Sequence, residues 1–212
     1  MPVIAVDGPA ASGKGTIARA LAGHYGLPHL DTGALYRAVA VAVRRNHIDP
    51  GDGEAAGRLA HALDLSLLED PSLRSDAVAA IASQVSAHPP VRAALLAFQQ
   101  RFAAQDGGAV LDGRDIGTVV APQAEAKLFV TARPEVRAHR RYLELLANGQ
   151  PVHERDVLAD ILARDQRDTS RVLSPLQPAH DAVLLDTSDF DIGAAIRRAI
   201  EMVDSRLKEA RR

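Results

Sequence analysis

A glycine-rich run directly behind a short apolar segment is the part of this chain whose spacing could do chemistry. The segment is Val3-Ile4-Ala5-Val6, and the run is Gly8-Pro9-Ala10-Ala11-Ser12-Gly13-Lys14-Gly15-Thr16. A strand that leads into such a loop and then into a helix is the layout of a P-loop, whose backbone N–H groups and helix N-terminus bind phosphate oxygens. A lysine at the position of Lys14 reaches the outer phosphates. We therefore predict that residues 8–16 bind a nucleoside triphosphate and that Lys14 is catalytic.

The last residues of this loop narrow the class of nucleotide-binding protein. The general motif places Ser or Thr directly after the lysine, where its hydroxyl binds Mg²⁺. Here Gly15 occupies that position and the hydroxyl follows at Thr16, which we expect to contribute to a Mg²⁺ site. A Gly-Lys-Gly-Thr ending is similar to that of small kinases that phosphorylate nucleoside monophosphates, more than to that of a GTPase. An ordinary glycine-rich turn is the alternative, but the strand, the spacing, Lys14 and Thr16 argue against it.

Aspartates end several of the apolar segments that we interpret as strands. They are Asp7, Asp31, Asp112 and Asp186. Ligands of open parallel sheets bind at the carboxyl ends of the strands, so these side chains are expected on the ligand side. Asp112 is the best candidate for a second Mg²⁺ ligand, direct or through water, because phosphoryl transfer uses a carboxylate beside the P-loop. A helix cap or a turn residue is the alternative role.

Alternating helix and strand patterns must position these residues. Apolar residues at helical spacing, with Pro and Gly near the ends, predict helices over residues 14–25, 33–45, 89–102, 134–147, 152–170 and 192–208. Short helices are expected between residues 54 and 87. Apolar runs predict strands over residues 3–6, 29–30, 109–112, 126–131 and 182–186. The alternation predicts an α/β fold with a five-stranded parallel sheet flanked by helices.

The bulk composition argues against several classes of protein. Of 212 residues, 47% are hydrophobic and 25% are charged, as in an ordinary globular protein. The net charge of −2 argues against a nucleic-acid-binding protein that depends on positive charge. The absence of cysteine excludes disulfides and thiolate chemistry. No apolar run is long enough for a membrane span and the first strand begins almost at once, so we expect a cytoplasmic protein with no membrane partner. A monomer is expected by default.

Polar segments beyond the P-loop carry a resemblance to a known family. The chain resembles the bacterial cytidylate kinases over nearly its whole length. The resemblance is clearest in Asp112-Gly-Arg-Asp-Ile-Gly-Thr-Val-Val120, in the run from Asp31 to Arg37 and in the Arg/Asp run from Arg164 to Arg171. It implies a P-loop NTPase fold and a phosphotransferase that uses ATP with Mg²⁺ to convert CMP and dCMP into CDP and dCDP, in pyrimidine nucleotide metabolism.

The same resemblance implies how the chain is divided. One kinase domain would span residues 1–212. Its core would be residues 1–33, 106–136 and 172–212, its acceptor-binding insert about 34–105, and its short helical lid about 137–171. The stretch of residues 65–76 is shorter than in longer members of the family, so we expect a reduced insert with little strand.

The acceptor base can be distinguished by its hydrogen-bonding groups. Cytosine has an amino donor at N4 and acceptors at N3 and O2, whereas uracil inverts the first two. A carboxylate that faces N4 and donors that face N3 and O2 would therefore select cytosine. By resemblance, Asp115 is that carboxylate, and Ser83 and Arg92 are the donors. A wrong base would leave buried polar groups unpaired, at a cost of about 1–3 kcal/mol each.

Arginines supply the positive charge that an acceptor phosphate needs. The resemblance assigns this phosphate to Arg37, Arg114 and Arg171, the ribose to Arg164 and Asp168, and the lining of the acceptor pocket to Thr32 and Tyr36. The members of the last run also fall on one helical face, since Arg164, Arg167, Asp168 and Arg171 are spaced at i, i+3, i+4 and i+7. A solvated helix face with local ion pairs is the alternative.

Arginines of the expected lid are candidate catalytic residues. By resemblance, Arg137 and Arg141 offset charge on the transferred group, as arginine fingers do, and Arg171 takes part with them. Exposed arginines that improve solubility are the alternative for the two lid residues.

Two rival functions remain open at this point. The first is a kinase for UMP, AMP or a non-nucleotide acceptor, which the P-loop alone cannot separate from a CMP kinase. The second is a nucleotide-dependent switch protein without an acceptor. A GTP switch would need a guanine-recognising Asn-Lys-x-Asp segment, which the sequence lacks.

Overall fold

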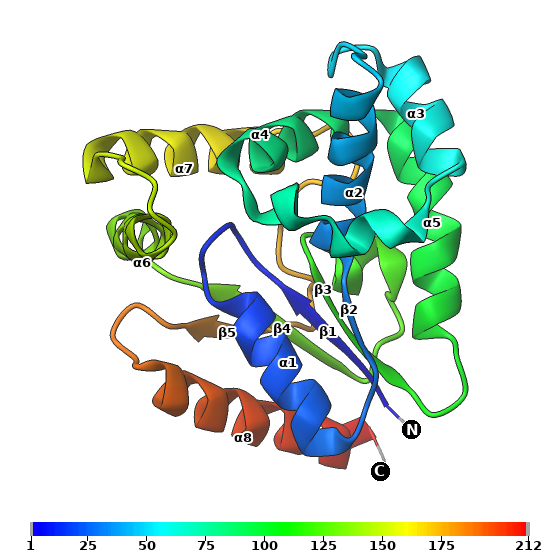
Figure 1. The fold of residues 1–212 in the computed structure, drawn as a ribbon. Helices are drawn as coiled ribbons and strands as arrows, with labels where there is room; N and C mark the ends of the chain where they lie inside the picture. Colours follow the sequence, from blue (N-terminus) through cyan, green and yellow to red (C-terminus); the bar gives the residue numbers. More distant parts are fainter. Residues whose placement is uncertain (1, 211–212) are drawn as a thin grey trace. The chain divides into compact units, whose positions relative to one another are not determined.

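The computed structural model describes residues 2–210 apart from the side chain of Arg74, and it contains a five-stranded sheet in the order β2-β3-β1-β4-β5 (Figure 1). The strands are β1 (Val3–Asp7), β2 (His29–Asp31), β3 (Ala109–Gly113), β4 (Ala126–Thr131) and β5 (Val183–Asp186). The pairings β1–β3, β1–β4 and β4–β5 are parallel. The predicted α/β fold with a five-stranded parallel sheet is confirmed.

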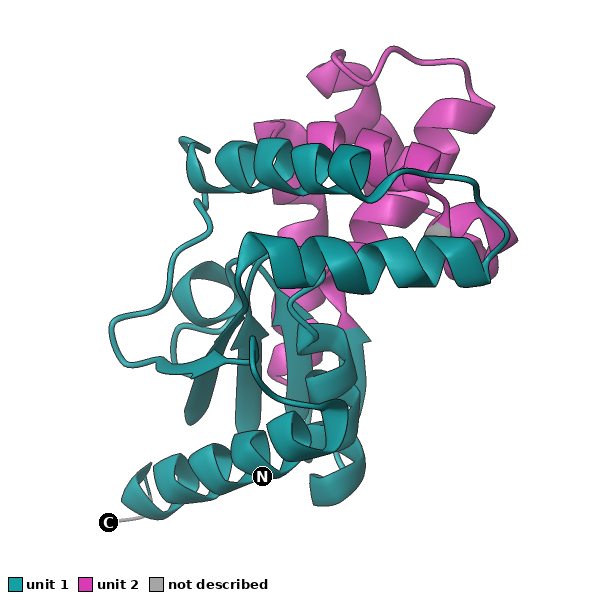
Figure 2. Cartoon of the chain, turned by 90° about the vertical axis from the view of Figure 1, so that its left-hand side faces the viewer, with its two compact units in different colours: residues 1–30, 105–212 teal, residues 31–104 magenta. Residues whose placement is uncertain are grey.

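The chain divides into two units, which are described separately. The sheet unit comprises residues 1–30 and 105–212, and the helical unit comprises residues 31–104 (Figure 2). The strand β2 lies at the passage from one to the other.

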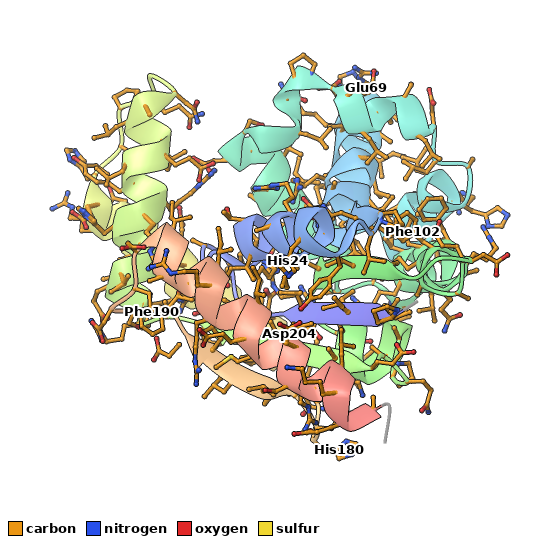
Figure 3. All side chains as sticks on the ribbon, turned by 90° about the horizontal axis from the view of Figure 1, so that it is seen from below. His24, Glu69, Phe102, His180, Phe190 and Asp204 are labelled. Carbon is orange, nitrogen blue, oxygen red and sulfur yellow. The ribbon has the colours of Figure 1, made fainter. Side chains whose placement is uncertain are left out.

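Helices α1 (Lys14–Tyr25) and α8 (Ile192–Ala210) cover one face of the sheet (Figure 1). Their buried Ile17, Leu21, Ala199 and Val203 pack in one cluster with apolar side chains of the strands. A polar contact adds to this packing, because the Tyr25 hydroxyl donates to Asp204 Oδ1 at 2.8 Å, and burial and this carboxylate raise the pKa of Tyr25. Figure 3 labels Asp204 on α8.

Helices α6 (Pro134–Ala147) and α7 (Glu154–Thr169) form an antiparallel hairpin in the sheet unit (Figure 2). A small apolar cluster of Ala138, Leu145, Val157 and Ile161 holds the two arms together. Pro134 lies in the first turn of α6, where its missing N–H costs no helical hydrogen bond, and Gly149 ends the turn after α6 with a φ of 72°.

The helical unit is built from short amphipathic helices. They are α2 (Thr32–Arg45), α3 (Gly53–His61), η1 (Leu65–Glu69), η2 (Pro71–Arg74), α4 (Asp76–Val85) and α5 (Pro89–Ala103). Aspartates begin several of them, since Asp31 Oδ1 accepts from Ala34 N at 3.1 Å and Asp52 Oδ1 accepts from Ala55 N at 2.9 Å. As expected, residues 65–76 contain short 3₁₀ turns and no strand.

One element was not predicted. Residues Ile116–Val120 form a single π-helical turn, η3, directly behind β3. Single π turns occur often at functional sites. No helix among residues 2–210 combines the length and the apolar character that a membrane crossing requires.

Candidate active site

The backbone of residues 8–16 has the conformation of a phosphate-binding loop. A side chain at Gly8 is impossible, because a Cβ there would lie 2.0 Å from the carbonyl oxygen of Val130. Gly13 adopts a left-handed conformation with φ of 89° and precedes the first turn of α1. The loop therefore ends at a helix N-terminus, whose N–H groups and dipole favour an anion.

Lys14 is the first residue of α1, as the P-loop interpretation requires. Its ammonium lies 3.5 Å from the carbonyl oxygen of Pro9, so the side chain lies along its own loop. A contact of this length is at the limit of a hydrogen bond.

Two residues that follow the loop by more than 100 positions contact its carbonyl groups, and a third supports one of them. Arg137 Nη1 donates to Ala10 O at 3.2 Å, and Thr187 Oγ1 lies 3.1 Å from Ser12 O. Arg140 supports Thr187 through Nη1, which donates to its Oγ1 at 3.0 Å, and through Nη2, which donates to its carbonyl oxygen at 2.7 Å. The loop is thus fastened to the start of α6 and to the segment after β5.

Arg137 is the most extensively bonded of these residues and is 3% exposed. Besides Ala10, its guanidinium binds Ala132 O through Nε at 2.8 Å and the Asp165 carboxylate through Nη1 at 3.0 Å and Nη2 at 2.6 Å. It therefore joins both arms of the α6–α7 hairpin to the loop. A catalytic role for Arg137 stays a prediction, and its bonds in this structure favour the positioning of other groups.

Asp112, near the carboxyl end of β3, has the chemistry expected of an Mg²⁺ ligand. Its Oδ1 lies 2.8 Å from His29 Nε2, and its Oδ2 would be 3.7 Å from a Cβ at Gly15. One carboxylate oxygen is therefore held by the imidazole, and the other faces Gly15 in the first turn of α1. Thr16, the next residue, is exposed, and its hydroxyl is the second candidate ligand. Carboxylate and hydroxyl oxygens are ligands that Mg²⁺ prefers.

Among the residues that the structure describes, no three His, Asp or Glu side chains form a metal-binding group. The two candidate ligands, Thr16 and Asp112, fit a nucleotide-bound cation, because Mg²⁺ commonly keeps several waters and binds phosphate oxygens together with one or two protein ligands.

A buried cluster of opposite charges lies around Asp168, which is 1% exposed. Arg114 Nε donates to Asp168 Oδ2 at 2.9 Å, and Arg171 Nη2 donates to Asp168 Oδ1. Burial alone would raise the pKa of Asp168, but Arg114, Arg171 and Arg164 together hold that pKa below its ordinary value. Two arginines assigned to the acceptor phosphate and two residues assigned to the ribose are thus brought together. The ribose role of Asp168 stays a prediction, since its oxygens bind arginines here.

The remaining lid arginine is placed differently. Arg141 forms an ion pair with Glu144 one turn along α6, with Nη1 and Oε2 at 2.8 Å. Its side chain is only partly buried. The two lid arginines predicted to act alike therefore have different surroundings, and the catalytic role of Arg141 stays a prediction.

The segment that connects β3 to η3 carries Arg114 and Asp115, both predicted to bind CMP. Asp115 is 5% exposed and is the N-cap residue of η3. Asp7, at the end of β1, accepts hydrogen bonds from the next two backbone amides, Ile116 N and Gly117 N, each at 2.8 Å. Burial raises the pKa of Asp7 to about 7, although these two hydrogen bonds lower it.

Candidate acceptor residues of the helical unit also come together in pairs. Arg37 Nη2 donates to Asp31 Oδ2 at 2.7 Å, close to the buried Thr32. The Arg92 guanidinium lies 5.7 Å from the centre of the Tyr36 ring, within cation–π range. Residues far apart in the sequence, on α2 and α5, are therefore neighbours.

Ser83, on α4, is 2% exposed, and its carbonyl oxygen accepts from Ser86 Oγ at 3.1 Å. Arg92 binds the same turn, because its Nη1 donates to Ser86 O at 3.1 Å. These two candidate base-binding residues thus meet at one turn of the helical unit. Their shared role with Asp115 stays a prediction.

Sequence reasoning assigned no role to His29, Thr187 or Asp165. Asp165 lies inside the Arg/Asp run, where its spacing from the arginines of the other arm was not apparent. His29 is the first residue of a three-residue strand, and its partner Asp112 is 83 residues further along the chain, so no local pattern indicated the contact. Thr187 directly follows Asp186, but nothing in its neighbours indicates a contact with Ser12.

Comparison with solved structures supports the fold alone. A gluconokinase from Sinorhizobium meliloti 1021 superposes with a TM-score of 0.51 at 16% identity, over 98% of this chain and 94% of that chain. An uncharacterized protein from Eubacterium ventriosum superposes with a TM-score of 0.55 at 14% identity, over 97% and 99% of the two chains.

Comparison of sequences is far closer. The cytidylate kinase of Rhodopseudomonas palustris strain TIE-1 is 57% identical over 203 residues, which is 96% of each chain. The cytidylate kinase of Xanthobacter autotrophicus is 57% identical over 96% of this chain and 98% of its own. The family model named Cytidylate kinase matches residues 4–205. On these matches, the chain belongs to the cytidylate kinase family.

Proposed function

We propose that this chain transfers the γ-phosphoryl group of ATP to CMP and dCMP, giving ADP and CDP or dCDP. The family membership supports the reaction. The observation that carries the acceptor side is the buried Arg114–Asp168–Arg171 cluster, in the same unit as the P-loop. A switch protein without an acceptor has no use for two guanidinium groups held at one buried carboxylate.

The donor is bound by residues 8–16. Backbone N–H groups of the loop and of the first turn of α1 bind the phosphates, and Lys14 follows the charge as it moves to the leaving oxygen. Thr16 and Asp112, the latter directly or through water, would hold Mg²⁺. When bound, this cation offsets charge on the β- and γ-phosphates.

The acceptor-binding residues keep their proposed roles. Arg37, Arg114 and Arg171 bind the CMP phosphate, Arg164 and Asp168 bind the sugar, and Ser83, Arg92 and Asp115 bind the base, with Thr32 and Tyr36 beside them. The unit of residues 31–104 is then the acceptor-binding insert, and α6 and α7 form the lid. Positive charge at the acceptor offsets the repulsion between two phosphate groups, which otherwise opposes in-line attack.

A coupled assay of ADP release, with Mg-ATP and CMP, dCMP, UMP, AMP, GMP or water alone, tests this proposal. We expect turnover with CMP and dCMP that exceeds turnover with the other acceptors by about 100-fold, from the loss of two or more buried hydrogen bonds. The variant Lys14→Ala is the control and is expected to lose turnover with every acceptor. Preference for another acceptor would keep the kinase and reject the base recognition, and ATP hydrolysis without any acceptor would favour the switch protein.

The oligomeric state is a separate proposal. We propose a monomer, and sedimentation equilibrium at assay concentrations checks it. A dimer mass would contradict this proposal without affecting the reaction.

A further inference from the structure

Asp7, the last residue of β1, is a buried carboxylate that the proposed chemistry does not use. It directly precedes Gly8 of the P-loop and is 4% exposed. Its Oδ1 accepts from Ile116 N and its Oδ2 from Gly117 N, each at 2.8 Å. One side chain therefore connects the strand that leads into the P-loop with the segment that carries Asp115.

The hydrogen bonds of Asp7 replace a cap that η3 otherwise lacks. Asp115 is the N-cap residue of this π-helical turn, but its own side chain makes no cap hydrogen bond. The first N–H groups of a helix need acceptors, and a carboxylate satisfies them with favourable charge. Because Asp7 supplies this acceptor, the carboxylate of Asp115 is not used as the cap.

The segment lies tightly against Asp7. A Cβ at Gly117 would lie 3.4 Å from Asp7 Oδ2 and 3.1 Å from Lys127 Cδ. A methyl group at Gly117 would therefore press on Lys127 and on the Asp7 carboxylate, and a neighbour would have to shift by a few tenths of an ångström. The charged groups that act on Asp7 through space are Asp115, which raises its pKa, and Lys14, which lowers it.

We infer that Asp7 is a positioning residue for base recognition, whose carboxylate fixes the amides of Ile116 and Gly117 and so orients Asp115 towards the cytosine amino group. This inference rests on the proposed function, in which Asp115 recognises the base. It assigns to the end of the P-loop strand a role in the choice of acceptor.

The variant Asp7→Asn tests the inference through selectivity. Asparagine keeps the shape but has one acceptor oxygen, and its amino group would face an N–H donor. We expect the ratio of kcat/KM for CMP to that for UMP to fall by about fivefold or more, the equivalent of about one hydrogen bond. We expect the KM for ATP to change by less than about twofold, since general damage to the fold would lower both kcat/KM values alike.

Asp186→Asn is the matched control. Asp186 also ends a strand, and its Oδ1 accepts from one backbone amide, Ser188 N, at 2.8 Å. This variant should leave the CMP to UMP ratio unchanged. A fall of the same size in Asp186→Asn would overturn the inference, because it would show a general effect of losing a strand-end carboxylate.

Gly117→Ala is a second variant, which retains the Asp7 carboxylate. It tests the same inference if Asp7→Asn does not fold. It should lower the same ratio, while Gly23→Ala, on α1 with no atom near its Cβ, should not. Asp115→Asn separates the proposed base recognition by Asp115 from the inferred positioning role of Asp7. An unchanged ratio in Asp115→Asn rejects base recognition by Asp115 and the inference with it. A lowered ratio there and an unchanged ratio in Asp7→Asn and Gly117→Ala overturns the inference alone.

Discussion

His29 Nε2, on the first residue of β2, lies 2.8 Å from Oδ1 of Asp112, near the carboxyl end of β3. The Asp112 side chain is 4% exposed and that of His29 is 17% exposed, so water competes little for this hydrogen bond. The imidazole fixes the rotation of the carboxylate and leaves Oδ2 facing the first turn of α1. An outer partner of this kind orients a metal ligand without touching the metal.

The variant His29→Ala should therefore weaken cation binding to the protein–ADP complex. We expect the dissociation constant of Mn²⁺, measured by electron paramagnetic resonance with Mn²⁺ in place of Mg²⁺, to rise by about tenfold. His180→Ala, which removes a side chain that is 95% exposed, is the control. Equal Mn²⁺ affinity in His29→Ala and the wild type would show that the imidazole does not contribute to cation binding through Asp112.

The Arg137–Asp165 pair should be worth far more than the surface ion pairs of this protein. Both terminal nitrogens of the Arg137 guanidinium, Nη1 and Nη2, donate to the Asp165 carboxylate, and the Arg137 side chain is 4% exposed. Loss of one partner leaves a buried charge without its counter-ion. In a double-mutant cycle with Ala substitutions, we expect a coupling of about 2 kcal/mol in the free energy of unfolding, measured with urea.

The exposed pair Arg198–Glu201 on α8 is the matched control for that cycle, with a coupling expected below about 0.5 kcal/mol. Similar coupling in the two pairs would mean that burial of Arg137 adds nothing. The same variants test a catalytic role, because a positioning role allows Asp165→Ala to lower activity as much as Arg137→Ala, whereas an arginine finger does not.

Removal of the Asp168 carboxylate should affect the acceptor more than the donor. In Asp168→Asn, Arg114 and Arg171 would lose the charge that keeps them together, and both would move. We expect the KM for CMP to rise by about tenfold or more, from weaker charge-assisted bonds, with the KM for ATP nearly unchanged. Equal changes in both KM values would place the defect in the fold of the sheet unit rather than at the acceptor.

Much of the fold was predictable because each element carries a local signal. Helix α6 begins at Pro134 and strand β4 ends at Thr131, as predicted from Pro chemistry and from a bounded apolar run. The π-helical turn η3 was not predictable in the same way. Its stability depends on Asp7, more than 100 residues earlier, and no local pattern in Ile116–Val120 reports such a partner.

The candidate site shows the same division between local and distant contacts. Lys14 and the glycines around it could be predicted because the loop needs those residue types at fixed spacing. The partners of Arg137 could not be predicted, because the sequence alone does not distinguish a buried structural arginine from an arginine finger. Helical spacing placed Arg164, Asp168 and Arg171 on one helical face. This was wrong for Arg171, because α7 ends at Thr169 and Arg171 reaches Asp168 from the segment that follows the helix. Arg114 reaches the same carboxylate from the segment after β3, which helical spacing could not predict.

Asp7 gives the stability of this protein a pH dependence of defined sign. Burial raises its pKa from 3.8 to about 7, so between these values the folded protein binds a proton that the unfolded chain has lost. The contribution of Asp7 to stability is therefore present in full below pH 3.8 and is lost as the pH rises through 7. The shift corresponds to about 4 kcal/mol if unopposed.

Asp7→Asn removes this titration and makes the effect measurable as a difference. The free energy of unfolding of the variant, relative to the wild type, should increase by a few kcal/mol between pH 4.5 and pH 8, in urea titrations at fixed ionic strength. Asp168→Asn should show no such increase over the same range, because the pKa of Asp168 is lowered and its contribution is lost only at more acidic pH. A constant difference for Asp7→Asn would mean that the carboxylate keeps an ordinary pKa, so that its two backbone donors offset the whole cost of burial.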